Sequence, residues 1–117
     1  MEAERKAAIE QTLGTIEARI RNADSIRDDR RGELLDLLGK LKSEVASLSQ
    51  TDEEQARSIA GFAELSAHEA TRSEKNPQLL EHAVAGLSSS VKGFEESHPR
   101  LVQIVNAVSG FLSNLGI

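Results

Sequence analysis

Residues 101–117 contain no formally charged side chain, although Asp, Glu, Lys and Arg make up 28% of the chain. Within this segment, large apolar residues recur at alternating steps of four and three, at Leu101, Val105, Val108, Leu112 and Leu115. Such spacing places them on one face of a helix. An uncharged helix with one apolar face needs a surface that covers this face. The segment therefore predicts packing against other helices, in the same chain or in another molecule.

The composition favours an all-α protein of one domain. The chain has 117 residues, with three Phe, no Tyr and no Trp. Its core must therefore come from Leu, Ile, Val and Ala, the mixture found in helix bundles. Prolines number only two, and good helix formers dominate the long segments. We expect an antiparallel bundle of four to five helices with heptad-like seams, which oligomerisation would complete if one chain cannot cover every seam.

Apolar spacing and breaking residues divide this single domain, residues 1–117, into five expected helices. They cover residues 2–22, 28–48, 52–72, 77–96 and 99–115. The strongest pattern is the unbroken heptad seam of the second helix. Because the apolar stripes of the first two helices are in phase, one long helix is the alternative to the hairpin that we favour.

Two of these helices carry conflicting signals. The segment 52–72 begins with a capping-box pattern at Thr51 and Glu54, but it is poor in large apolar residues, so we expect a weak, peripheral helix. Before the last helix, the heptad phase continues across Pro99. Proline cannot donate a backbone hydrogen bond and disfavours helical geometry at the preceding residue. We therefore favour a break at Pro99 over a kinked long helix.

The segment Phe94-Glu95-Glu96-Ser97-His98-Pro99, followed by an apolar helix that closes with Leu115-Gly116-Ile117, resembles a known pattern. It is similar to a bacterial family of short helical proteins, DUF4404-like, whose function is unknown. In that family a Phe-Glu-x-Ser-His-Pro segment leads into a terminal helix ending in Gly-Ile. The resemblance implies two charged leading helices over residues 2–48 and a closing pair over residues 77–117. It implies no activity, substrate or cofactor.

The sequence offers no clear motif for a catalytic, cofactor or metal site. The absence of cysteine removes disulfides, thiolate metal sites and cysteine nucleophiles. His68 and His82 lie on different expected helices without the paired ligands of a zinc site, and His98 is better explained as a cap beside Pro99 than as a pH sensor or ligand. We therefore expect no catalytic residue, no cofactor and no metal, and we do not expect an enzyme.

Charge and hydropathy limit the partners. The net charge is −5, and the densest arginine group, residues 27–31, is interleaved with acidic residues, which argues against a nucleic acid partner. The segment 1–8 is polar and charged, unlike a secretory signal, and no apolar run approaches the length of a membrane span. We expect a cytoplasmic protein.

Three arrangements would cover the uncharged last helix. It packs inside its own bundle, it also pairs with a second chain, or it lies on a membrane surface with its polar face toward water. Our leading hypothesis is a non-enzymatic interaction or scaffolding module that self-associates, as a homodimer or larger, or that binds another protein. The alternative is peripheral membrane binding through the last helix, which the lack of basic residues disfavours. The predicted contact residues are Leu80, Val84, Leu87, Val91, Phe94, Leu101, Val105, Val108, Leu112 and Leu115.

Overall fold

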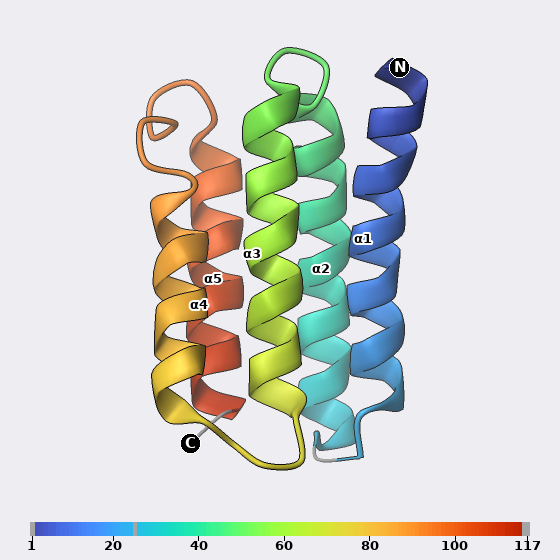
Figure 1. Cartoon of the computed structure of the whole chain (residues 1–117), viewed down its shortest axis with the longest axis vertical. Coiled ribbons are helices and arrows are strands. Elements are labelled where there is room, and N and C mark those ends of the chain that lie inside the picture. Colours follow the sequence, from blue (N-terminus) through green and yellow to red (C-terminus); the bar gives the residue numbers. More distant parts are fainter. Residues whose placement is uncertain (1, 25, 116–117) are drawn as a thin grey trace.

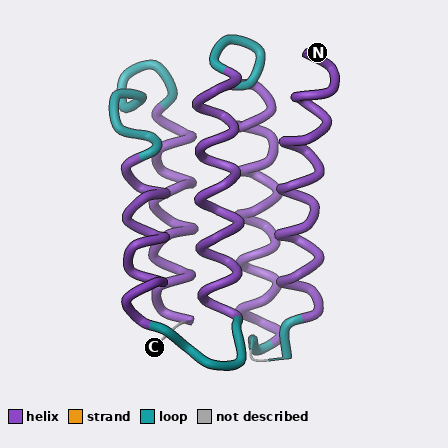
Figure 2. The backbone as a smooth tube through the Cα atoms, in the orientation of Figure 1, coloured by secondary structure: helices purple, strands orange, loops and turns teal. Residues whose placement is uncertain are grey.

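Five helices form the bundle, and each runs antiparallel to the one before it (Figure 1). The computed structural model describes residues 2–24 and 26–115, and all regular structure within them is helical (Figure 2). The helices are α1 (Glu2–Asn22), α2 (Asp28–Leu48), α3 (Glu53–Thr71), α4 (Pro77–Ser89) and α5 (Pro99–Leu115). The expected all-α bundle is confirmed. None of these helices is long and apolar enough to cross a membrane.

The helix α3 is the centre of this arrangement. It contacts all four other helices, whereas α1 packs against α2 and α3 alone, and α5 packs against α2, α3 and α4. In Figure 1, α3 stands in front of α2, with α1 on one side and α4 on the other. The prediction of a weak, peripheral helix over residues 52–72 is therefore wrong.

Alanine explains why α3 takes the central place. Its buried face consists mainly of small residues. The buried residues of α3 are Ala56, Ile59, Ala60, Ala63, Ser66, Ala67, Glu69 and Ala70. Short side chains let neighbouring helices approach closely, so one helix can contact several others. A pattern built on large apolar residues does not register such a face.

The turn between α1 and α2 makes a hairpin, not one long helix. Arg31 of α2 reaches back across this turn and donates hydrogen bonds to the backbone carbonyls of Ile20 (3.2 Å), Ala23 (2.6 Å) and Ile26 (2.8 Å). Carbonyls at the end of a helix have no partner within it, and arginine offers several donors in a fixed geometry. A single side chain therefore satisfies the carbonyls of the turn.

Side-chain caps start the next two helices. The carboxylate of Asp52 accepts from the backbone N–H of Gln55 (3.3 Å), and the side chain of Asn76 accepts from that of Leu79 (3.2 Å). Asn76 is a residue type that commonly caps helices, and Pro77 lies in the first turn of α4, where proline is well tolerated. At α3, however, the cap is Asp52 and not the Thr51 that the capping-box pattern indicated.

The helix α4 ends at Ser89, seven residues before the end predicted from the heptad phase. Ser90 caps it, and the chain then turns through Gly93, whose φ of 94° lies in the left-handed region that glycine adopts most readily. The backbone N–H of His98 donates to the carbonyl of Phe94 (2.8 Å), and α5 begins at Pro99. The chain is thus broken before Pro99, as expected, but over a loop and not a single residue.

Candidate interaction surface

The predicted contact seam is mostly buried inside the single chain. Seven of its residues belong to the core, namely Leu80, Leu87, Val91, Leu101, Val105, Val108 and Leu112. The other three, Val84, Phe94 and Leu115, are partly buried and pack against the same core. In this fold, most of the predicted contact residues are therefore covered by their own chain.

Large apolar side chains reach the surface at another place, on the face formed by α3 and α4. Among the side chains that the structure describes, the exposed large apolar ones are Phe62 (38% exposed), Leu65 (45%) and Leu79 (45%). The first two belong to α3 and the third to α4. Exposed apolar side chains that gather on one face mark a candidate binding surface.

A glycine shapes this face. The ring of Phe62 lies against Gly86 of α4 so closely that a Cβ atom there would overlap its Cε1 and Cδ1 atoms. Since α3 and α4 run antiparallel, seven residues along each helix from this contact bring Glu69 level with Leu79. Phe62 and Leu79 therefore both lie where α3 meets α4, and Leu65 lies about one helical turn from Phe62 on α3. We call these three residues the α3–α4 patch.

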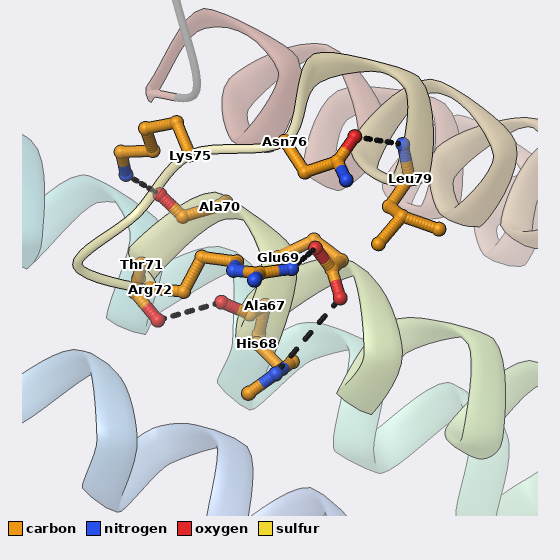
Figure 3. A network of polar contacts seen from close by, with 9 residues as sticks. All are labelled: Ala67, His68, Glu69, Ala70, Thr71, Arg72, Lys75, Asn76 and Leu79. Atoms are coloured by element: carbon orange, nitrogen blue, oxygen red, sulfur yellow. Dashed lines mark hydrogen bonds and ion pairs between the residues drawn. The ribbon is translucent and has the colours of Figure 1, made fainter.

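A buried ion pair lies beside the patch (Figure 3). Glu69 is 6% exposed, and its carboxylate oxygen Oε1 lies 2.9 Å from Nη1 of Arg72. Its other oxygen, Oε2, is 3.9 Å from Nε2 of His68. A carboxylate removed from water must be compensated in this way, and loss of Arg72 would leave it uncompensated.

The corner between α3 and α4 is also held by backbone acceptors. Lys75 donates from its ammonium group to the carbonyl of Ala70, and the hydroxyl of Thr71 donates to the carbonyl of Ala67 (2.7 Å). Together with the cap at Asn76, these bonds satisfy groups at the end of α3 and the start of α4 (Figure 3). The apolar patch is therefore presented by two helices with a defined corner.

A hollow lies on the other side of the bundle from the patch, between α2 and α5. It has a volume of about 520 Å³, and Gly39 and Ile104 lie among the side chains around it. The charges at its rim are paired with each other, with Arg100 Nε 3.6 Å from Glu44 Oε1 and another ion pair between Lys40 and Asp36. This hollow is open and lined by both signs of charge, so it lacks the apolar surface of the α3–α4 patch.

The histidines do not come together. His68 is on α3, His82 is exposed on α4, and His98 precedes α5, where its ring meets Phe94 edge-on with centroids 5.5 Å apart. Its Nδ1 lies 3.0 Å from the Ser97 hydroxyl. Within the described residues, no group of three or more His, Cys, Asp or Glu side chains is placed to hold a metal ion.

Sequence reasoning did not single out the α3–α4 patch. The prediction for residues 52–72 took account only of their few large apolar residues, and the predicted contact seam includes Leu80 but not Leu79. The available signal was their position, because Phe62 and Leu65 lie away from the face that Ala56, Ile59, Ala60 and Ala63 define.

The model of the DUF4404 family, a domain of unknown function, matches residues 34–117, which run from α2 to the end of the chain. The chain belongs to the DUF4404 family. The match includes the whole α3–α4 patch, most of α2 and all of α5, whereas α1 lies outside it. No curated protein and no solved structure matches this DUF4404 chain.

Proposed function

We propose that this DUF4404 protein is a non-enzymatic helical module that works by binding protein, and in the first place by self-association. The observation that carries the proposal is the α3–α4 patch, where Phe62, Leu65 and Leu79 are exposed while the heptad seam of α4 and α5 is used within the chain. Interface cores are depleted in charge and enriched in aromatic and large apolar residues. We therefore assign self-association to this patch and not to the seam.

The surroundings of the patch support a protein partner. Phe62 has a fixed seat on Gly86, so binding would cost little side-chain entropy at this position. Charged groups such as Arg72 stand at its edge, as in interfaces with an apolar centre and a polar rim. A helix face from another molecule fits such a surface.

Membrane binding through α5, the alternative function, has less support. The apolar face of α5, including Leu101, Val105 and Leu112, is buried against its own bundle. Its exposed face carries uncharged polar residues such as Gln103 and Asn106, and its one basic residue, Arg100, is paired with Glu44 of α2. To insert its apolar face into a lipid surface, α5 would have to leave the core, which would expose the seam of α4.

Size-exclusion chromatography with light scattering tests the proposal. The chain mass is 12.7 kDa, so we expect twice that mass or more at tens of micromolar. Leu65→Asp should restore the monomer mass, because it places a charge in the patch, and its far-ultraviolet circular dichroism should stay helical. Asn106→Asp, an exposed change on α5, is the matched control and should leave the assembly intact. A wild-type protein that is a strict monomer under these conditions would overturn self-association.

A further inference from the structure

We infer that α3 pairs with α3 of a second copy of this chain, antiparallel, around a two-fold axis at the level of residue 63. This inference rests on the proposed function and names its partner and geometry. It starts from the outer ridge of α3, on the side away from the core. The positions of this outer ridge follow steps of four and three, and they are Glu54, Ser58, Gly61, Leu65, His68 and Arg72.

The ridge is accessible along its length. Glu54, Ser58, Gly61, Leu65 and His68 are exposed, and Arg72 is partly exposed. With a helical period of 3.6 residues, these positions lie almost opposite the alanine face that packs on the other helices. In Figure 1 this side of α3 faces the viewer, between α4 and α1. Positions spaced in this way on a free face are those that a second helix would contact.

The residues of the ridge are complementary to those of a second ridge that runs in the opposite direction. In an antiparallel pair centred at residue 63, Leu65 of one copy lies opposite Gly61 of the other, and Glu54 lies opposite Arg72. The large residue thus meets the small one, and the acidic end meets the basic end, twice in each dimer. A parallel pair would instead place Glu54 beside Glu54 and Arg72 beside Arg72, which is unfavourable.

The surface around Gly61 has room for the opposite leucine. A Cβ atom at Gly61 would meet no other atom within 4 Å. The glycine lines a hollow of about 160 Å³ between α1 and α3, with Thr12 on one side and Glu64 on the other. Leu65 is 45% exposed and stands one helical turn away. The two copies therefore offer a knob and a hole to each other at two equivalent points.

Phe62 adds an apolar contact close to the axis. It is one residue from the centre, so the Phe62 rings of the two copies would be about 3 Å apart in height at ~1.5 Å per residue. Its ring lies toward α4, on Gly86. Aromatic pairs in offset or edge-on contact stabilise interfaces beyond the area that they bury. Phe62 and Leu65 would then form the dry centre of the dimer.

The available area is sufficient for a stable dimer. The bundle measures 37 × 25 × 23 Å along its principal axes, and the face that carries α3 spans the two longer ones. A standard interface covers roughly 800 Å² on each partner. The two-fold axis places α4 opposite α4 and α1 opposite α1, so both flanking helices contribute to this area.

Cysteine cross-linking tests the geometry, because the natural chain contains no cysteine. Chains with Ser58→Cys and chains with His68→Cys are given different mass tags, mixed, and treated with a short bis-maleimide. The antiparallel pair brings position 58 of one copy level with position 68 of the other. Equal positions are about 15 Å apart along the axis at ~1.5 Å per residue. The mixed product should therefore exceed each homodimeric product several-fold.

Each outcome has a defined meaning. Chains with Asn106→Cys, on α5, should give no product with either partner and serve as the control. Homodimeric products from Ser58→Cys alone, from a protein that light scattering shows to be dimeric, would overturn the antiparallel pairing and leave self-association standing. A monomeric protein without cross-linked products would overturn both.

Filling the hole gives a second, independent readout. Gly61→Leu should abolish the dimer in light scattering while the circular dichroism spectrum stays helical, because the monomer has space for this side chain. Gly39→Leu, at an equally open helical glycine on α2, is the matched control and should remain dimeric. A Gly61→Leu protein that dimerises as tightly as the wild type would overturn the knob-and-hole contact.

Discussion

Replacing Gly86 by alanine should destabilise this protein or leave its stability unchanged, although the same change at Gly39 should stabilise it. Alanine is favoured over glycine inside a helix by about 1 kcal/mol. A Cβ atom at Gly39 would meet nothing within 4 Å, so the full gain is expected there. At Gly86 the new methyl group would overlap the Phe62 ring, so the ring would have to move away from Gly86.

The cost of moving this ring follows from its burial. Phe62 is 38% exposed, so more than half of its surface is covered by the residues around it. A phenylalanine buries on the order of 150–250 Å² when fully covered, at roughly 25 cal/mol per Å². Losing part of this contact costs about 1–2 kcal/mol, which cancels or exceeds the helix gain. Gly86→Ala should therefore lie about 1–2 kcal/mol below Gly39→Ala in the free energy of unfolding.

A double-mutant cycle isolates the contact. In a Phe62→Ala background the obstacle is gone, and Gly86→Ala should then stabilise by about 1 kcal/mol. All variants are unfolded with urea at the same low protein concentration. Unfolding is followed by circular dichroism, because the chain has no Trp or Tyr for fluorescence. If Gly86→Ala stabilised as much as Gly39→Ala in both backgrounds, Phe62 would not be seated on Gly86, and the description of the α3–α4 patch would be wrong.

Other changes test the fold at single points. Arg31→Met should lower the free energy of unfolding by about 1–3 kcal/mol, because it leaves carbonyls of the α1–α2 turn unpaired. Arg27→Met, at an exposed position nearby, should change this free energy little. Urea unfolding of both variants measures the difference. Val105→Asp should abolish cooperative thermal unfolding, since it buries a charge in the core, and Asn106→Asp next to it should not. Asn76→Ala should cost about 1 kcal/mol and increase amide hydrogen exchange in the first turn of α4; unchanged protection would contradict the cap.

Periodic large apolar residues made most of this fold predictable. The seam of α2 from Leu34 to Leu48 is buried as its spacing indicates, and the apolar face of the uncharged segment is covered by the bundle. The predicted helix over residues 77–96 was too long for a related reason. Val91 is buried and Phe94 partly buried although both follow the helix, so a loop continues the seam. Periodicity reports which residues face the core, and a loop can keep that phase.

The site was less predictable, because a seam does not say which surface covers it. Leu87, Val105 and Leu112 satisfy the same heptad rule whether they face another helix of the same chain or of a second chain. In the single chain they are buried, which places the candidate surface elsewhere. Only the relative position of α3 and α4, which the sequence does not encode locally, brings Phe62 onto Gly86.

The composition of α3 connects its central place with its free surface. Because its inner face is lined by alanine, α3 lies close to all four neighbours, and yet none of them covers the side that carries Leu65. A helix that served only the core of its own chain would need a single apolar face, with polar residues opposite. Here the side opposite the alanines is polar toward both ends, with opposite charges at Glu54 and Arg72, but it has Gly61 and the exposed Leu65 at its centre. That arrangement is what pairing of α3 with a second, reversed copy of itself requires.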